Sequence, residues 1–203
     1  MQREINTLGR NEAVVYCAGM THSLRKITFE STPNPATMKF LFHQKIADQG
    51  FECQSAQESD RSPLAAKIFG FPWTSSVYIG VDFVTVTKQD WVDWELLAQP
   101  LCGLIQEHFD RREPIVVEVV SEEDDSADSP LIRNIKSVLN REIRPVVALD
   151  GGDIVFHKLE GSTLFIRMKG ACSGCPSSSV TLKRGVESRM KELFPEIHEV
   201  LAV

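Results

Sequence analysis

The chain has 203 residues, which is long for one compact domain and sufficient for two small ones. Its 42% hydrophobic and 25% charged residues are typical of a soluble globular protein. The net charge is −6 and the basic residues form no stripe, so we expect no nucleic-acid partner. No apolar run approaches the ~18 residues needed to span a bilayer, so we expect no membrane association.

Residues 1–24 are predicted to be a disordered leader outside the folded domains. They lack the apolar core of a signal peptide, and Glu4 and Glu12 are atypical of an organellar transit sequence. Periodic sequence begins near Leu24, so Met20 is an alternative start. These features favour a cytoplasmic bacterial protein, with the mitochondrial matrix as the alternative.

Residues 25–113 are predicted to form the first domain. Two β-like runs, 26–30 and 38–43, are separated by a turn rich in proline, and Ser62-Pro63 has the composition of a helix start. Two further strands are expected at 75–79 and 83–87, and polar residues alternate with valines in the second of them. A closing amphipathic helix is predicted from apolar residues at helical spacing, namely Trp91, Trp94, Leu97, Leu101, Leu104 and Ile105.

Residues 114–128 are predicted to be a flexible acidic linker. The stretch 121–128 contains no apolar residue larger than alanine, so it cannot bury enough surface to become ordered. The second domain, 129–203, opens with a capping serine followed by proline, and an apolar helical face runs to Ile143, where Pro145 is expected to end it. A hairpin, a second helix and a last strand follow. The predicted fold class is α+β, with the order α-β-β-α-β in the second domain.

The most informative motif is a pair of cysteines, Cys172 and Cys175, between Gly170 and Pro176. The five cysteines are few and odd in number, which favours a reducing compartment, where a C-x-x-C pair binds metal or is redox-active. The pair is expected on a strand-to-helix turn, where free N–H groups stabilise thiolates. Metal sites of this kind need about four protein ligands, so the motif is half of a site.

Four interpretations of the pair remain open from the residues alone. It could be a dithiol–disulfide redox centre, although nothing upstream resembles a thioredoxin-type unit. It could be half of a zinc site, although the five histidines show no ligand spacing. It could be structurally idle. Finally, two copies of the chain could meet so that four thiolates hold one iron–sulfur cluster, which alone explains the half-complete ligand set.

The sequence resembles the NifU-like (Nfu-type) iron–sulfur proteins in both predicted domains. In the second domain the resemblance rests on Leu149–Asp153, the hairpin, the cysteine run and residues 185–187. In the first domain it rests on Thr32-Pro33-Asn34-Pro35, Lys39-Phe40, Ser62-Pro63 with its following Leu64-Ala65, and the run 83–88. Together these motifs cover about residues 26–203, and the Gly70–Trp73 turn departs from the family pattern.

The resemblance implies a carrier rather than an enzyme. Nfu-type proteins bind a [4Fe-4S] cluster between two C-terminal domains and hand it to apo-proteins, so Cys172 and Cys175 would be the ligands contributed by each chain. The implied partners are a second copy of the chain, apo iron–sulfur client proteins and an upstream cluster scaffold. We therefore expect both cysteines to be exposed, close together and at the edge of their domain.

Overall fold

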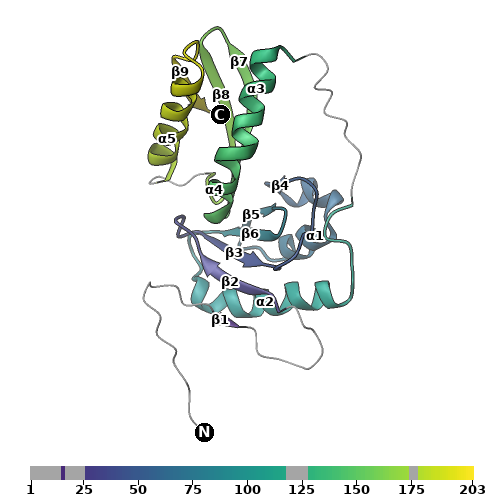
Figure 1. Cartoon of the computed structure of the whole chain (residues 1–203). Helices are drawn as coiled ribbons and strands as arrows, with labels where there is room; N and C mark the ends of the chain where they lie inside the picture. The colour runs from purple at the N-terminus through teal and green to yellow at the C-terminus, as the bar shows by residue number, and fades with distance from the viewer. Residues whose placement is uncertain (1–14, 17–25, 118–127, 174–177) are drawn as a thin grey trace.

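The computed structural model describes residues 15–16, 26–117, 128–173 and 178–203, which form two domains stacked one above the other (Figure 1). The lower domain is built on a six-stranded sheet and the upper one on a three-stranded sheet. Each domain has its own cluster of buried apolar residues. The predicted α+β class and the two-domain organisation are confirmed.

The sheet of the first domain is antiparallel throughout. Its strands lie in the order β1 (Val15–Tyr16), β2 (Thr28–Ser31), β3 (Thr37–Leu41), β6 (Phe83–Lys88), β5 (Thr74–Ile79) and β4 (Phe51–Cys53). The four strands expected from the sequence are present, whereas the three-residue β4 was not predicted.

One face of this sheet packs on helices and forms the first core. The helical elements are η1 (Ala56–Arg61), α1 (Pro63–Phe69) and α2 (Trp94–Asp110), and α2 lies beneath the sheet in Figure 1. Phe40, Val84 and Ile105 are fully buried in this core. Ser62 begins α1 as predicted, because its hydroxyl accepts the Ala65 N–H at 3.0 Å.

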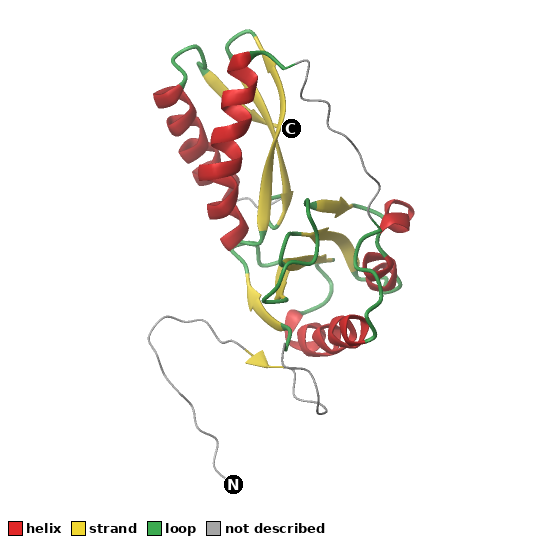
Figure 2. Cartoon of the chain, turned by 45° about the vertical axis from the view of Figure 1, so that its right-hand side comes forward, coloured by secondary structure: helices red, strands yellow, loops and turns green. Residues whose placement is uncertain are grey.

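The second domain has the predicted α-β-β-α-β order. It comprises α3 (Pro130–Val138), the π-helical segment η3 (Leu139–Ile143), α4 (Arg144–Leu149), β7 (Gly152–Glu160), β8 (Thr163–Gly170), α5 (Ser178–Leu193) and β9 (Glu199–Ala202). β7 and β8 form the hairpin, and β9 pairs parallel with β8. The helices lie on one side of the sheet (Figure 2), and Ile135, Ile154 and Met190 meet in the core between them.

The prediction that Pro145 ends the first helix of this domain is wrong. Proline lacks an N–H and cannot be placed inside a regular α-helix without losing a hydrogen bond. Here the π-helical turn η3 interrupts the α-helical pattern just before it, so Pro145 falls in the first turn of α4, where no N–H is required. The segments α3, η3 and α4 therefore form one continuous helical rod that ends at Leu149.

Some predictions at the edges of the domains also need correction. Val15–Tyr16, inside the segment expected to be disordered, pair with β2; the rest of that segment lies outside the described residues. Most of the predicted linker, 118–127, lies outside them as well, whereas the Val117 N–H bonds Arg61 O at 2.7 Å and so holds to the first domain. Trp91 precedes α2 and is 67% exposed, not near the core.

The cysteines of the first domain differ from expectation too. Cys53 lies in a polar stretch of the sequence, which favours an exposed thiol, yet it is fully buried, and burial raises the pKa of its thiol to about 12. Cys102 is buried and disulfide-bonded, which the sparse cysteine count did not predict. Among the helices that the structure describes, none is both long and apolar enough to cross a membrane.

Candidate functional site

Cys172 lies in the tight turn that follows β8. The turn is closed by the Ser173 N–H, which donates to Gly170 O at 3.0 Å, and Gly170 has a φ of +62°. This left-handed conformation is strained for residues with a side chain, so glycine is needed there. The Ala171 N–H donates to Gly151 O at 3.1 Å and ties the turn to the start of β7.

Cys172 is 3% exposed, so the expectation of an exposed thiol is wrong for this residue. It carries a thiol outside any disulfide, and it packs among the apolar residues of the second core. The side chain fits because Gly152 has none: a Cβ there would meet Cys172 Sγ at 2.3 Å. Cys175 lies outside the described residues, so the distance between the two cysteines stays untested.

The Gly151–Gly152 turn is held in place by the contacts of Asp153, the residue that follows it. Asp153 forms a bidentate ion pair with Arg144, with Nε to Oδ1 at 2.7 Å and Nη2 to Oδ2 at 2.8 Å. The Ile154 N–H also donates to Asp153 Oδ1 at 2.8 Å. Both oxygens of the Asp153 carboxylate therefore accept hydrogen bonds, and these contacts orient the turn beside Cys172.

A row of polar side chains crosses the first domain's sheet on the face opposite its core. Strand pairing sets Glu30 beside Lys39, Lys39 beside Thr85, Thr85 beside Tyr78, and Tyr78 beside Glu52. Successive residues of a strand point to opposite faces, so these five share one face while their neighbours enter the core. We call these five residues the polar row.

The polar row contacts the second domain at its centre. Lys39 Nζ donates to Leu149 O at 3.0 Å, at the end of α4. The Tyr78 hydroxyl donates to Asp153 Oδ2 at 2.9 Å, so the carboxylate that Arg144 holds also links the two domains. Lys39 and Tyr78 are only 5% and 3% exposed, which shows that this face of the sheet is covered.

The polar row also contacts the turn that carries Cys172, residues 170–173, which we call the cysteine turn. Glu52 Oε1 accepts the Gly170 N–H at 2.9 Å. Thr85 lies so close to Gly151 and Gly170 that a Cβ on either glycine would stand 2.8 Å and 3.1 Å from its side-chain atoms. Within the described part of the chain, the buried Thr85 hydroxyl has no hydrogen-bond partner.

Asn34, in the loop between β2 and β3, forms hydrogen bonds to the cysteine turn through its side chain. Its Nδ2 donates to Ala171 O at 3.2 Å and more weakly to Ser173 O at 3.5 Å, the residues on either side of Cys172. Its Oδ1 accepts the Ala36 N–H at 3.0 Å, which fixes the amide's orientation. The first domain therefore holds both neighbours of Cys172 through one buried side chain.

Burial at this contact changes the acidity of two side chains. Burial raises the pKa of Tyr78, and the negative charge of Asp153 raises it further. Burial also raises the pKa of Glu52, while the hydrogen bond from Gly170 acts in the opposite direction. Tyr78 is consequently a hydroxyl donor throughout the physiological pH range.

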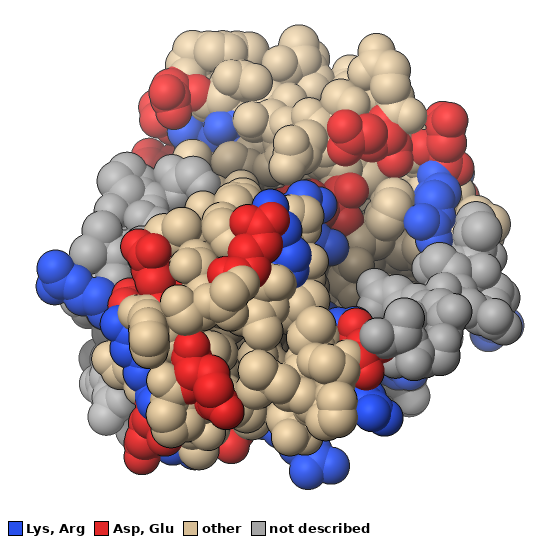
Figure 3. Space-filling view, turned by 90° about the horizontal axis from the view of Figure 1, so that it is seen from above, with Lys and Arg blue, Asp and Glu red and all other residues tan. Residues whose placement is uncertain are grey.

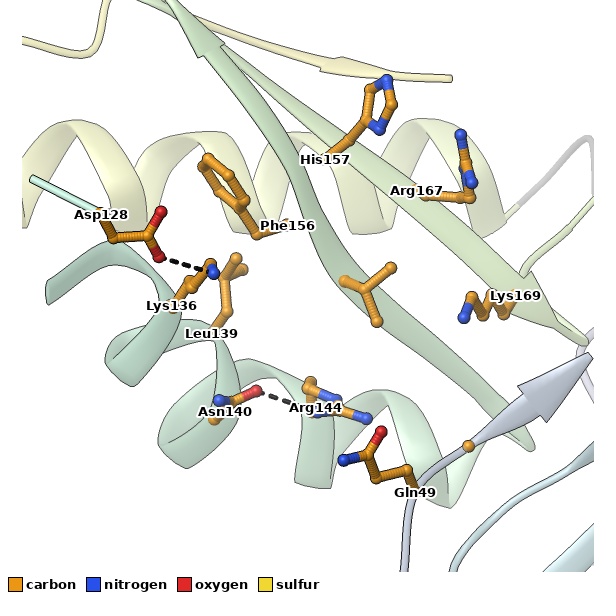
Figure 4. A pocket seen from close by; sticks show the side chains of 12 residues that line it. Gln49, Asp128, Lys136, Leu139, Asn140, Arg144, Phe156, His157, Arg167 and Lys169 are labelled. Carbon is orange, nitrogen blue, oxygen red and sulfur yellow. Dashed lines mark hydrogen bonds and ion pairs between the residues drawn. The ribbon is translucent and has the colours of Figure 1, made fainter. Parts of the chain in front are cut away.

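A cavity of about 620 Å³ opens beside the contact, between Gln49 of the first domain and the hairpin and helices of the second (Figure 4). Two of its cations already have partners: Lys136 Nζ lies 2.6 Å from Asp128 Oδ2, and Arg144 is held by Asp153. Lys169, just before the turn that carries Cys172, is among the described residues that line the cavity, but none of residues 170–173 is. It is therefore separate from the cysteine turn.

The described ranges contain no group of three or more histidine, cysteine, aspartate or glutamate side chains that could hold a metal ion. On the face seen in Figure 3, acidic and basic side chains are interspersed and neither sign forms a continuous patch.

Sequence reasoning proposed Cys172 and Cys175 as ligands but missed Asn34, Tyr78 and Glu52 as contacts of the cysteine turn. The alternation of polar residues with valines in 83–87 was a partial signal, because it indicates a sheet face that does not enter the core, although such a face can equally be solvated. Glu52 gave no signal, since its short strand was not predicted.

Two family models match the chain, one in each domain. The model described as "Scaffold protein Nfu/NifU N terminal" matches residues 27–112, and the "NifU-like domain" model matches residues 135–201. Both matched ranges fall within the domains predicted from the sequence.

Curated relatives agree with the family models. The chain is 35% identical over 179 residues to the "NFU1 iron-sulfur cluster scaffold homolog, mitochondrial" of Drosophila willistoni, covering 86% of this chain and 62% of the relative. The same named protein of Drosophila persimilis is 35% identical, with 86% and 64% covered. The chain thus spans less than two thirds of the length of these relatives.

Among solved structures, the NifU-like protein from Saccharomyces cerevisiae is 25% identical, with a TM-score of 0.43 over 50% of this chain and 93% of that one. The two family models match residues 27–112 and 135–201, and the curated relatives align with 86% of the chain. The chain belongs to the Nfu family, with an Nfu N-terminal domain followed by a NifU-like domain.

Proposed function

We propose that this protein is an iron–sulfur cluster carrier that binds its cluster through Cys172 and Cys175. The observation that carries the proposal is the Cys172 thiol in a tight turn at the end of β8, within a C-x-x-C motif of a NifU-like domain. Iron–sulfur clusters are held by cysteine thiolates, so the donor chemistry fits. The relatives carry the words "iron-sulfur cluster scaffold" in their names, which supports the same class.

The proposed cargo is a [4Fe-4S] cluster shared by two chains. Such a cluster takes four thiolates, and each C-x-x-C motif contributes two. A homodimer in which two NifU-like domains face one another therefore completes the ligand set. A cluster held in this way is lost when the chains part, which suits a protein that receives a cluster from an upstream scaffold and passes it to apo-protein clients.

The relatives' names favour the mitochondrial matrix as the site of action, which was the alternative location expected from the sequence. The bacterial cytoplasm finds no support in these names. Localisation of a tagged full-length protein by fractionation tests this part of the proposal.

Anaerobic reconstitution with iron and sulfide tests the cargo. We expect one four-iron cluster per two chains, measured as iron and acid-labile sulfide content together with native mass. Cys172→Ser and Cys175→Ser should each abolish the cluster, because each removes two of its four ligands in the dimer. Cys53→Ala is the matched control, since Cys53 is buried in the first domain and should leave cluster content unchanged.

A full cluster on a monomer would contradict the proposal, as would iron that remains bound after either motif cysteine is replaced. The alternative function, a thiol–disulfide oxidoreductase using the same pair, requires an accessible nucleophilic thiolate. Cys172 is 3% exposed, so either function requires the thiol to become accessible, and the assays distinguish the two. Insulin reduction without iron at a rate that depends on both cysteines would support that alternative.

A further inference from the structure

The polar row and Asn34 form a surface on the first domain that fits the cysteine turn of the second. We propose that this surface is a docking site for the cysteine turn and that docking competes with cluster binding. In the docked arrangement the turn is held and Cys172 stays in the core; cluster binding requires the two domains to separate. The competition rests on the proposed function, whereas the docking itself does not.

The first step is that Cys172 cannot hold a shared cluster where it lies. A cluster between two chains needs each thiolate at the domain surface, and Cys172 is 3% exposed and packed in the second core beside Gly152. For the thiol to reach the surface, the turn 170–173 must move or the Cys172 side chain must rotate out of the core, and a shift of the turn exposes the thiol most directly.

The second step is that the first domain prevents this change. Glu52 accepts the N–H of Gly170, and Asn34 donates to the carbonyl groups of Ala171 and Ser173. The backbone is therefore held before and after Cys172, over the whole length of the turn. A new path for the turn requires these bonds to break.

The third step is that the contact is suited to reversible docking. The interactions that join the polar row and Asn34 to the second domain are hydrogen bonds, with an ion pair of Arg144 and Asp153 behind one of them. The two apolar clusters are separate, and each stays within its own domain. Polar contacts between domains of one chain are weak enough that relative motion is the normal behaviour. Each domain can keep its core when the two part.

The fourth step is that the docked face is specific to this turn. Gly151 and Gly170 both have positive φ angles and lie against Thr85, Lys39 and Tyr78, so the glycine backbones allow the close approach. When the turn leaves, the polar row becomes accessible. A loaded protein would thus present a face that the docked protein conceals.

The test measures the alkylation rate of Cys172 by iodoacetamide in the full chain carrying Cys175→Ser, read by peptide mass spectrometry. Tyr78→Phe removes the bond to Asp153, and Asn34→Asp replaces the donor to Ala171 by an acceptor. Each should raise the alkylation rate about fivefold, the equilibrium effect of one net hydrogen bond.

Thr85→Val gives a change in the opposite direction. It replaces a buried hydroxyl, unpaired among the described residues, by a methyl group of similar shape, so it should favour docking and slow alkylation. Thr87→Val is the matched control. Thr87 lies on the same strand and face but bonds Thr37 within the first domain, so the rate should stay at the wild-type value.

Urea unfolding of each variant shows whether the domains remain folded. Wild-type alkylation rates in folded Tyr78→Phe and Asn34→Asp, or faster alkylation in Thr85→Val, would overturn the docking proposal. Cluster uptake under reconstitution then tests the competition: the first two variants should load faster than wild type, and equal rates would overturn it. Absence of any cluster in the wild type would instead count against the proposed function and leave the alkylation result valid.

Discussion

At the scale of single residues, the site depends on glycines, which have no side chain, as much as on residues that contribute one. Gly152 makes space for Cys172 Sγ, and Gly151 and Gly170 adopt backbone angles that other residues rarely reach. The cysteine turn is therefore sensitive to substitutions that leave every proposed ligand in place.

Gly152→Ala should displace Cys172 from the core. The new Cβ would stand 2.3 Å from Sγ and 3.1 Å from the cysteine's backbone nitrogen, so the turn must shift. Overpacking of this kind costs about 1–3 kcal/mol, measurable as a lower free energy of unfolding in urea, and Cys172 should be alkylated faster. Gly185→Ala in α5 is the control: no described atom lies within 4 Å of a Cβ built there, and the helix should become more stable by up to about 1 kcal/mol. Unchanged stability and reactivity of Gly152→Ala would refute the packing account.

His108 is the residue that should make the first domain sensitive to acid. Burial lowers the pKa of its imidazole below the ordinary 6.5, and the nearby positive charge of Lys67 acts in the same direction. The unfolded chain therefore binds a proton at a higher pH than the folded chain. The stability that depends on neutral His108 is present above pH 6.5 and is lost as the pH falls through the lowered pKa.

Urea unfolding at pH 7.5 and below pH 6.5 checks this prediction: the free energy of unfolding should decrease on acidification, and His108→Gln should remove part of that decrease. His157→Gln replaces an exposed histidine and should keep the wild-type pH dependence. An identical pH dependence in His108→Gln and wild type would show that another group is responsible.

At the scale of secondary-structure elements, the continuation of the helical rod through Pro145 decides where Arg144 lies. Hydrophobic periodicity predicted the rod as far as Ile143, and a proline ordinarily marks an end. The π-helical turn η3 places Pro145 in a first turn, and α4 then brings Arg144 to Asp153. A π-turn depends on the fit of the helix to the sheet beneath it, so the sequence pattern could not reveal it.

Arg144→Gln should destabilise the second domain. It leaves the Asp153 carboxylate, which is 4% exposed, without its charged partner. Because Arg144 is itself partly exposed, we expect a loss of about 1–3 kcal/mol in the free energy of unfolding. The control is Arg141→Gln in η3, an exposed arginine of the same rod, which should cost less than about 0.5 kcal/mol. Equal stability of the two variants would show that the Arg144 ion pair contributes little.

At the scale of the whole molecule, the first domain is both a separate folding unit and the cover of the cysteine turn. The sheet separates α2 on one face from the second domain on the other (Figure 1). This arrangement gives a role to the half-polar strand face that the sequence already displayed, and it connects Asn34 and Lys39, two of the residues that carried the family resemblance, to the proposed site.

The sequence by itself determined the two domains and the α-β-β-α-β order, and it supplied the C-x-x-C motif on which the proposed function rests. These properties follow from local patterns: alternation of two for strands, a period of 3.6 for helices, and cysteine spacing for ligand chemistry. Only the tertiary structure decided that Cys172 is buried and that Glu52, Tyr78 and Asn34 approach its turn. Burial and contacts between residues 75 to 139 positions apart depend on how the domains pack, which no local pattern records.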